Sequence, residues 1–299
     1  MMFISLLCYV GLLQTPVAPV LAESARVTTP AIQEMSGIVK SARYPDTFWV
    51  HNDSGDKSRI FAIRADGTFI GQKPKTGDYE GVEIGNAANA DWEDIARIGD
   101  TLYVSDLGNN GNSRRDLGIY AVTEPNPMAF PAARSFAWYP VAYPDQKDFP
   151  PKGTFDFDSE ALFAVRDTLF VITKHRAEGG KGPVGAASLY RLKRPQANRV
   201  NMLKKVDQKA DLGGWVTAAD ASPDGKMLAV LTQAPVQSVW LFDATAPQDK
   251  FLSKPLKRFV FSGGNQCEAI CFDGPDSLLI TNEQRQIFRV SLSRFTSVR

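Results

Sequence analysis

Short apolar runs alternate with polar turns along nearly the whole chain, and one arrangement of runs and turns recurs. In its clearest copy, the acidic stretch 91–94 leads into an apolar run, and a turn follows at Gly99-Asp100. A second apolar run at 102–104 then ends in the polar stretch 105–110. Period-2 alternation within such short runs is typical of β-strands, and no segment shows a sustained 3.6-residue period. The sequence therefore predicts a chain of short strands with little helix.

The recurring copies are spaced like the units of a β-propeller. Their equivalent positions, Ser36, Glu93, Glu160, Asp220 and Glu268, are 57, 67, 60 and 48 residues apart. A sheet unit that returns every ~40–50 residues, stretched by longer loops, is the sequence sign of a propeller. The sequence predicts an all-β, five-bladed β-propeller. Six blades are the alternative if residues 139–156 form one, although the prolines there disfavour strands.

The N-terminal part of the chain contains a predicted strand and a predicted signal peptide. Residues 25–33 are β-branched and alternate with polar residues, so we expect an N-terminal strand that completes the last blade and leaves no open edge. Residues 1–22 are apolar and end in Val20-Leu21-Ala22, which indicates a signal peptide and a secreted or periplasmic protein. A membrane anchor or a misassigned start codon is the alternative. The mature chain, 25–299, is expected to be a single propeller domain and a monomer.

Charge and cysteine content exclude several classes of protein. The net charge is +1 and the charged residues are spread along the chain, so no nucleic-acid partner is expected. The apolar run 3–13 is shorter than the ~20 residues that span a bilayer, and we expect no membrane span in the mature chain. Cys267 and Cys271 on one strand would lie some 13 Å apart, too far for a disulfide.

Propeller topology predicts that the repeated acids meet. The first strand of each blade lines the central channel, so acids at the start of these strands surround one mouth of it. Carboxylates that converge on a narrow channel repel one another, and a hard cation such as Ca²⁺ relieves the repulsion. An alternative is that these acids accept backbone hydrogen bonds and fix the register between blades. The predicted metal ligands are Glu93, Glu160, Asp220 and Glu268.

The second strand of each blade ends at the same mouth, and polar residues cluster there. They form the predicted ligand-binding set: Asn52, Asp53, Asp106, Asn109, Asn110, Asn282 and Glu283. Asp91, Asp94 and Asp158 are expected just above the acids. Lys174 and His175 are the candidate catalytic residues, because a histidine near a polar mouth can transfer protons and a lysine can pair with the acids. No serine-hydrolase, P-loop or zinc-protease motif occurs.

Several motifs carry a resemblance to a known group of proteins. These motifs are Asp-Trp-Glu-Asp-Ile-Ala at 91–96, Trp-Val-His-Asn-Asp-Ser-Gly at 49–55, Ala-Ser-Pro-Asp-Gly at 221–225 and Cys-Glu-Ala-Ile at 267–270. Over nearly all of the mature chain, it resembles uncharacterised secreted bacterial β-propellers. More distantly it is similar to propeller phytases, calcium-dependent lactonases and five-bladed apyrases, which implies a central Ca²⁺. The dense Lys and Arg residues of a phytase site are missing.

Two functions remain open at this stage. One is a metal-dependent hydrolase of small phosphate or lactone-type esters. The other is a non-enzymatic propeller that binds a small-molecule ligand or a protein partner and holds a structural metal.

Overall fold

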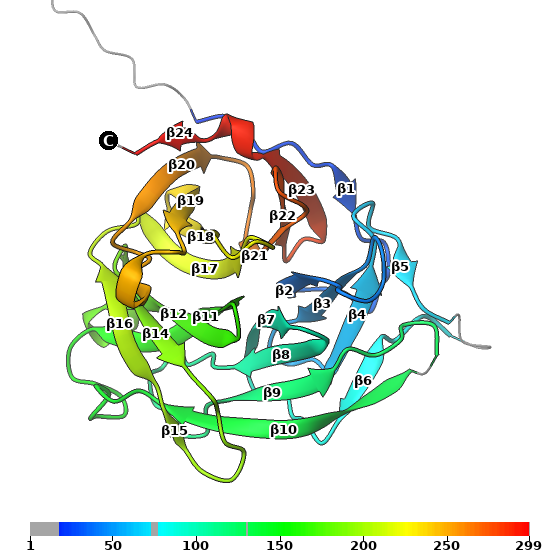
Figure 1. Cartoon of the computed structure of the whole chain (residues 1–299), viewed down its shortest axis with the longest axis horizontal. Helices are drawn as coiled ribbons and strands as arrows, with labels where there is room; N and C mark the ends of the chain where they lie inside the picture. Colours follow the sequence, from blue (N-terminus) through cyan, green and yellow to red (C-terminus); the bar gives the residue numbers. More distant parts are fainter. Residues whose placement is uncertain (1–17, 73–76, 130, 299) are drawn as a thin grey trace, which may run out of the picture.

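The computed structural model describes residues 18–72, 77–129 and 131–298, and this part of the chain is all-β. Its sheets surround a common centre (Figure 1). Five strands lie innermost, and each contacts the next in a closed cycle: β2 with β7, β7 with β11, β11 with β17, β17 with β21, and β21 with β2. The arrangement is propeller-like. These innermost strands are β2 (Met35–Lys40), β7 (Trp92–Ile98), β11 (Phe155–Val165), β17 (Gly214–Ala221) and β21 (Cys267–Phe272).

Each innermost strand pairs antiparallel with the strand that follows it, and the sheets continue outward in sequence order. The second strands are β3 (Phe48–Asn52), β8 (Thr101–Asp106), β12 (Thr168–Ala177), β18 (Met227–Pro235) and β22 (Ser277–Asn282). The third strands are β4 (Arg59–Ile63), β9 (Gly118–Thr123), β14 (Ala187–Leu192), β19 (Gln237–Asp243) and β23 (Gln286–Ser291). Three single 3₁₀ turns interrupt the loops: η1 (Glu178–Gly180), η2 (Pro247–Asp249) and η3 (Leu292–Arg294).

The outer strands are less regular than the inner ones. They are β1 (Ala25–Arg26), β5 (Phe69–Ile70), β6 (Val82–Gly85), β10 (Ala132–Ala142), β13 (Lys181–Val184), β15 (Asn201–Met202), β16 (Lys204–Lys209), β20 (Pro255–Phe261) and β24 (Thr296–Ser297). Strands β6 and β10 pair in parallel, which joins the sheet that starts at β2 to the sheet that starts at β7 and gives one ten-stranded sheet. The other three sheets have four, five and five strands.

Both chain ends complete a sheet. Strand β1 pairs with β23 through Ala25↔Ile287, which is the neighbour that the sequence predicts for an N-terminal strand. The strand is shorter than the predicted 25–33, but Val27 and Ile32 beyond it are fully buried. The C-terminal strand β24 pairs with β20, an addition that the sequence did not indicate. Each of these two-residue strands covers part of the edge of a longer strand and is itself the short edge strand of its sheet.

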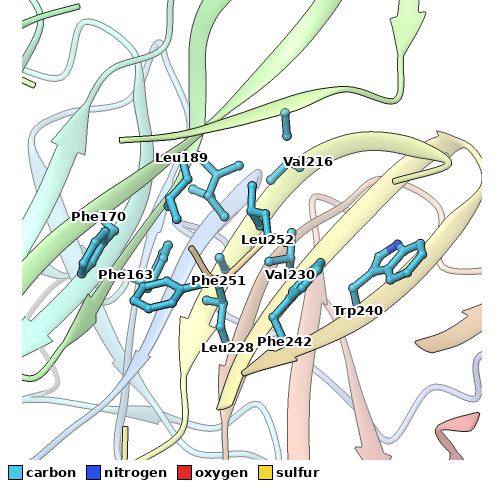
Figure 2. Packing of buried hydrophobic residues seen from close by; sticks show 14 of the residues in the cluster. Phe163, Phe170, Leu189, Val216, Leu228, Val230, Trp240, Phe242, Phe251 and Leu252 are labelled. Atoms are coloured by element: carbon cyan, nitrogen blue, oxygen red, sulfur yellow. The ribbon is translucent and has the colours of Figure 1, made fainter. Parts of the chain in front are cut away.

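The apolar side chains of neighbouring sheets meet face to face and form the core. Figure 2 shows one such interface, where the rings of Phe163 and Phe170 approach the ring of Phe251. The rings of Phe163 and Phe170 are stacked with centroids 5.4 Å apart. Close packing of this kind on both faces of each sheet holds the inner strands at fixed positions around the centre.

The remaining predictions about the chain can be placed on this fold. Cys267 and Cys271 are buried free thiols, so the prediction that they form no disulfide is confirmed. Residues 1–17 of the predicted signal peptide lie outside the described residues. Residues 18–22 are described, and Leu21 among them is buried and donates its N–H to the Ser262 carbonyl. In the described part of the chain, no helix is long or apolar enough to cross a bilayer.

Candidate functional site

A β-bulge occurs at the same place in every innermost strand, where it faces the second strand. The extra residue is Ser36, Glu93, Glu160, Thr217 or Glu268. A bulge leaves one residue out of the ladder and changes the direction of its side chain. The recurring position predicted from the sequence is therefore a bulge, and three of its five residues are glutamates.

Asp220 does not occupy the bulge position. The strand register shows that the prediction of Asp220 among the acids at this mouth is wrong. The equivalent residue in β17 is Thr217, and Asp220 lies three residues further along. It lines a cavity of about 540 Å³ together with Gly99, Asp167 and Gly225. These residues belong to the turns between first and second strands, so the cavity is at the opposite mouth. The Asp220 carboxylate accepts the N–H of Phe272 at 2.8 Å and fixes the register of the next strand.

At the acid-rich mouth, other polar residues form the hydrogen bonds that fix the register between neighbouring innermost strands. The Ser36 hydroxyl donates to the Glu93 carbonyl at 2.7 Å, and the Thr217 hydroxyl donates to the Cys267 carbonyl at 2.8 Å. Asp94 accepts the N–H of Leu162 at 2.9 Å. Each of these bonds links two neighbouring innermost strands. The Glu268 carboxylate accepts the side-chain amide of Gln233 on β18 at 2.9 Å, and the Glu160 carboxylate bonds Lys174. Among the described residues, no backbone N–H donates to the carboxylates of Glu93, Glu160 or Glu268, so the backbone register does not explain why these three positions are acidic.

Five acids form two overlapping groups at this mouth. The carboxylates of Glu93, Asp158 and Glu160 have oxygens within 4.8 Å of one another, and so do those of Asp53, Asp91 and Glu93. Glu93 belongs to both groups. It is buried, and its carboxylate accepts no hydrogen bond from the residues that the structure describes. The two groups therefore meet at a carboxylate that is free to bind something else.

The loop after β8 covers the acids closely and depends on a glycine. A Cβ at position 108 would lie 2.2 Å from Oε1 of Glu93 and 2.3 Å from Cγ of Asp91. Both distances are far below van der Waals contact, so only glycine allows this approach. The loop also holds Asp158 in place, because the N–H of Asn109 donates to Oδ1 of Asp158 at 2.7 Å.

Lys174 is the cation inside this cluster. Its ammonium group bonds Glu160 and lies 3.9 Å from Oδ2 of Asp158. Burial favours the neutral amine, but the charges of Glu160, Asp158 and Glu93 outweigh this effect and raise the pKa of Lys174 above its usual value. Lys174 stays charged and compensates one carboxylate. The prediction that it pairs with the acids agrees with its contacts.

One lysine does not balance the acids around it. Burial, followed by the charge of Glu160, raises the pKa of Glu93 and of Glu268 well above the usual range. The same two causes raise the pKa of Asp158 to about 6. Oε2 of Glu268 and Oδ2 of Asp158 are buried without a hydrogen-bond partner in the described part of the protein. Buried carboxylates left this way either take up protons or attract a cation.

His175 does not belong to the cluster, although it is adjacent to Lys174 in the sequence. Successive residues of a strand point to opposite faces, and β12 follows this rule. The imidazole Nδ1 lies 3.4 Å from Oδ1 of Asp156, and Nε2 lies 2.9 Å from the Thr173 hydroxyl. Burial lowers the pKa of His175, so the ring is neutral at pH 7. Of the two predicted catalytic residues, Lys174 therefore lies at the acids and His175 lies away from them.

Most of the predicted ligand-binding residues hold loops in place. Asn52 donates to the Ala31 carbonyl, and Asn282 donates to the Gly264 carbonyl. Asn109 donates to Phe157, Asp106 pairs with Arg114 at 2.9 Å, and Asn110 accepts a bond from Arg176. Asp53 and Glu283 are half-buried, and burial raises the pKa of both carboxyls. Of this set only Asp53 joins an acid group.

The structure adds two residues that the repeats did not mark. The Arg176 guanidinium lies over the ring of Trp215 at 4.5 Å, and the Lys174 ammonium lies over the same ring at 5.4 Å. Arg176 also comes within 3.8 Å of Oδ2 of Asp158. Trp215 lies two residues before the bulge in β17, at the position that Asp91 and Asp158 occupy before the bulges of β7 and β11. These two side chains form the rim of the acid cluster.

Comparisons with known proteins give weak similarities. No protein-family model and no curated protein sequence matches the chain. Among solved structures, one similar chain is described as a "putative 6-phosphogluconolactonase" from Bacteroides fragilis, with 12% identity, a TM-score of 0.42, and coverage of 88% of this chain and 83% of that one. Another is U3-55K, with 7% identity, a TM-score of 0.41, and coverage of 86% and 68%.

A pH prediction follows from the correction of Asp220. Burial raises the pKa of Asp220 to about 7, whereas an unfolded aspartate titrates near pH 4. Between these values the folded protein binds more protons than the unfolded chain, so stability falls as the pH rises. Asp220→Asn should make this fall shallower by up to about 1.4 kcal/mol per pH unit. Urea unfolding from pH 4 to 7, with a chelator present, measures both slopes; equal slopes would contradict the pKa assignment.

Proposed function

We propose that this protein is a five-bladed β-propeller whose acid-rich mouth binds Ca²⁺ and hydrolyses small phosphate or lactone-type esters. The observation that supports this best is the Glu93 carboxylate, which two acid groups share and no hydrogen bond uses. The blade count rests on the five innermost strands, with the ten-stranded sheet counted as two blades that are joined at their outer edges.

The chemistry of the donors fits a hard cation. Every candidate ligand at this mouth is a carboxylate oxygen, and the two buried thiols are not part of either acid group. Oxygen-only sets suit Ca²⁺ or Mg²⁺ rather than zinc. Oδ2 of Asp158 is buried and accepts no hydrogen bond from the described residues, although Lys174 and Arg176 lie 3.9 and 3.8 Å away, and a bound cation would satisfy it. Glu93, Asp158 and Glu160 would hold the ion, with Asp53 and Asp91 beside them.

The side chains around the acids suit ester hydrolysis. A bound Ca²⁺ would act as a Lewis acid on the substrate oxygen. Lys174 inside the acid cluster and Arg176 at its rim place positive charge near the ester, where negative charge develops as the ester is attacked. Asp91 is half-buried, and burial and the charge of Asp158 raise the pKa of its carboxyl, so Asp91 is our candidate for the general base.

The alternative is a binding propeller with a structural cation. The observation that favours it is the bond from Lys174 to Glu160, which already compensates part of the acidic charge without a substrate. In that case the same mouth would bind a small molecule or a protein and carry out no chemistry. In both cases we propose a secreted or periplasmic monomer.

Hydrolysis assays separate these two functions. The purified protein should release product from at least one small phosphate ester or lactone in calcium, and chelator should reduce the rate by at least about a hundredfold, since charge-stabilising groups contribute at that level. Lys174→Met tests the role of the lysine under the same conditions and should lower kcat. Calcium binding without turnover across both substrate classes would favour the binding propeller.

A further inference from the structure

The segment from residue 191 to residue 209 has a charge unlike that of the rest of the chain. It contains seven Lys or Arg residues and one acid, whereas the whole chain contains 34 basic and 33 acidic residues. The rest of the chain therefore carries a net negative charge. The overall balance does not reveal this concentration of positive charge, so the expectation that charged residues are spread along the chain is wrong for this segment.

The structure places much of this charge at the outer rim of the molecule. The segment includes the end of β14, the loop to β15, and β16, and Figure 1 shows it at the periphery beside β10. Two of its bases have acidic partners: Arg191 pairs with Asp249, and Lys205 lies 3.7 Å from Asp145. The acid Asp207 faces inward and bonds Ser253. No ion pair occurs within the described residues for Lys193, Arg194, Arg199, Lys204 and Lys209.

Apolar side chains lie among these unpaired bases. Lys193, Arg194 and Arg199 border a depression of about 390 Å³ together with Val200 and Met202. Val200 is 57% exposed and Met202 is 60% exposed, and they are among the few large apolar side chains that face water. Cations that surround exposed aliphatic side chains match the chemistry of a lipid surface, with anionic headgroups above acyl chains.

The loop is held in a defined shape, so these side chains are presented together. The Asn201 amide donates to the Pro140 carbonyl at 2.9 Å and to the Gln196 carbonyl at 3.0 Å. Its oxygen accepts the N–H of Gln196 at 2.8 Å. Strand β15 pairs with β10 through Val141↔Asn201. A surface fixed in this way loses little conformational freedom when it binds.

We propose that this rim surface, residues 193–204, binds the protein to membranes that contain anionic lipids. The unpaired bases attract the headgroups, and Val200 and Met202 enter the interface beneath them. A nucleic acid fits less well, because the surface offers aliphatic rather than aromatic side chains for contact with bases. The surface is built from other residues than the acid cluster, and it would bring the protein to a lipid surface whether or not the acids are catalytic.

Vesicle co-sedimentation of the full chain tests this proposal. The protein should pellet with vesicles of phosphatidylcholine and phosphatidylglycerol, and not with phosphatidylcholine alone. Each base near an anionic surface contributes about a fivefold gain in affinity at low salt, so the triple variant Lys193→Gln, Arg194→Gln, Arg199→Gln should bind about a hundredfold more weakly. High salt should weaken the binding of the wild-type protein to anionic vesicles, because salt screens these charges.

Two further variants make the test specific. Arg64→Gln, Lys226→Gln, Lys257→Gln removes the same charge from exposed positions elsewhere and should bind like the wild type. Val200→Ser with Met202→Ser keeps every charge and should bind at least several-fold more weakly. The proposal is overturned if wild-type protein ignores anionic vesicles, if the two triple variants bind equally, or if the serine variant binds unchanged. Retention by a soluble polyanion without vesicle binding would also overturn it.

Discussion

Replacing Glu93 by Gln is expected to abolish the response of the protein to calcium. Wild-type protein should be stabilised by a ligand that binds only the folded state, by about 2.7 kcal/mol at a hundredfold excess over Kd. Gln keeps the size of the side chain and removes the charge shared by the two acid groups. The melting temperature of Glu93→Gln should therefore be the same in calcium and in chelator, while that of the wild type should differ clearly between them.

Asp220→Asn is the matched control for this experiment. It also neutralises a single acid on an innermost strand, but Asp220 lies at the opposite mouth and bonds the Phe272 N–H. Asp220 accepts the N–H groups of Phe272 and Ala221 on its two oxygens, and Asn has only one acceptor oxygen, so the variant should lose one of these bonds and keep the full calcium response. A calcium response that survives in Glu93→Gln, or that disappears equally in both variants, would contradict the placement of the cation at the acid cluster.

Removing the N-terminal strand is expected to cause the largest loss of stability. A chain that starts at Met35 lacks β1, which pairs with β23, and lacks the fully buried Val27 and Ile32. Each such side chain contributes about 1.5–3 kcal/mol by burial. The loss should be at least about 3 kcal/mol before the exposed edge of β23 is counted. Thermal and urea unfolding measure it.

The control for this deletion is a chain that starts at Glu23. It keeps β1 and both buried side chains and loses only the contacts of the preceding residues, such as the buried Leu21. We expect it to be clearly more stable than the chain that starts at Met35. An equal melting temperature for the two chains would show that β1 does not close the last sheet in solution.

The repeated pattern in the sequence was sufficient to predict the all-β fold and its inner strands. Strands buried on both faces need apolar residues, with turns between the strands at regular intervals, and both requirements are visible in the order of residues along the chain. The bulge was not visible, because it depends on which backbone groups pair. In β17 the bulged residue is Thr217, which has no acidic character, so the nearest acid, Asp220, was aligned in its place. This alignment was wrong by three residues, and Asp220 lies at the opposite mouth of the channel.

The composition of the site was less predictable than its position. Glu93, Glu160 and Glu268 recur at one place in the repeat, and topology brings all three to one mouth. Glu93 and Glu160 belong to an acid group there, and Glu268 does not. Other members of the site depend on side-chain contacts between different strands, which the repeated pattern does not reveal. They are Asp158, Lys174, Arg176 and Trp215. The separation of His175 from Lys174 could have been anticipated from strand alternation alone. The ligand-binding role of the asparagines stays a prediction, because amides that hold loops look the same in sequence as amides that bind ligands.

Native mass spectrometry of the purified protein is the decisive test of the cation site, because it counts bound ions. We expect a calcium adduct on the wild-type chain after exchange into calcium, its removal by chelator, and its absence in Glu93→Gln. Asp220→Asn should carry the adduct like the wild type. A wild-type chain that shows no calcium adduct under conditions in which it remains folded would contradict the proposed cation site and, with it, the calcium-dependent hydrolase.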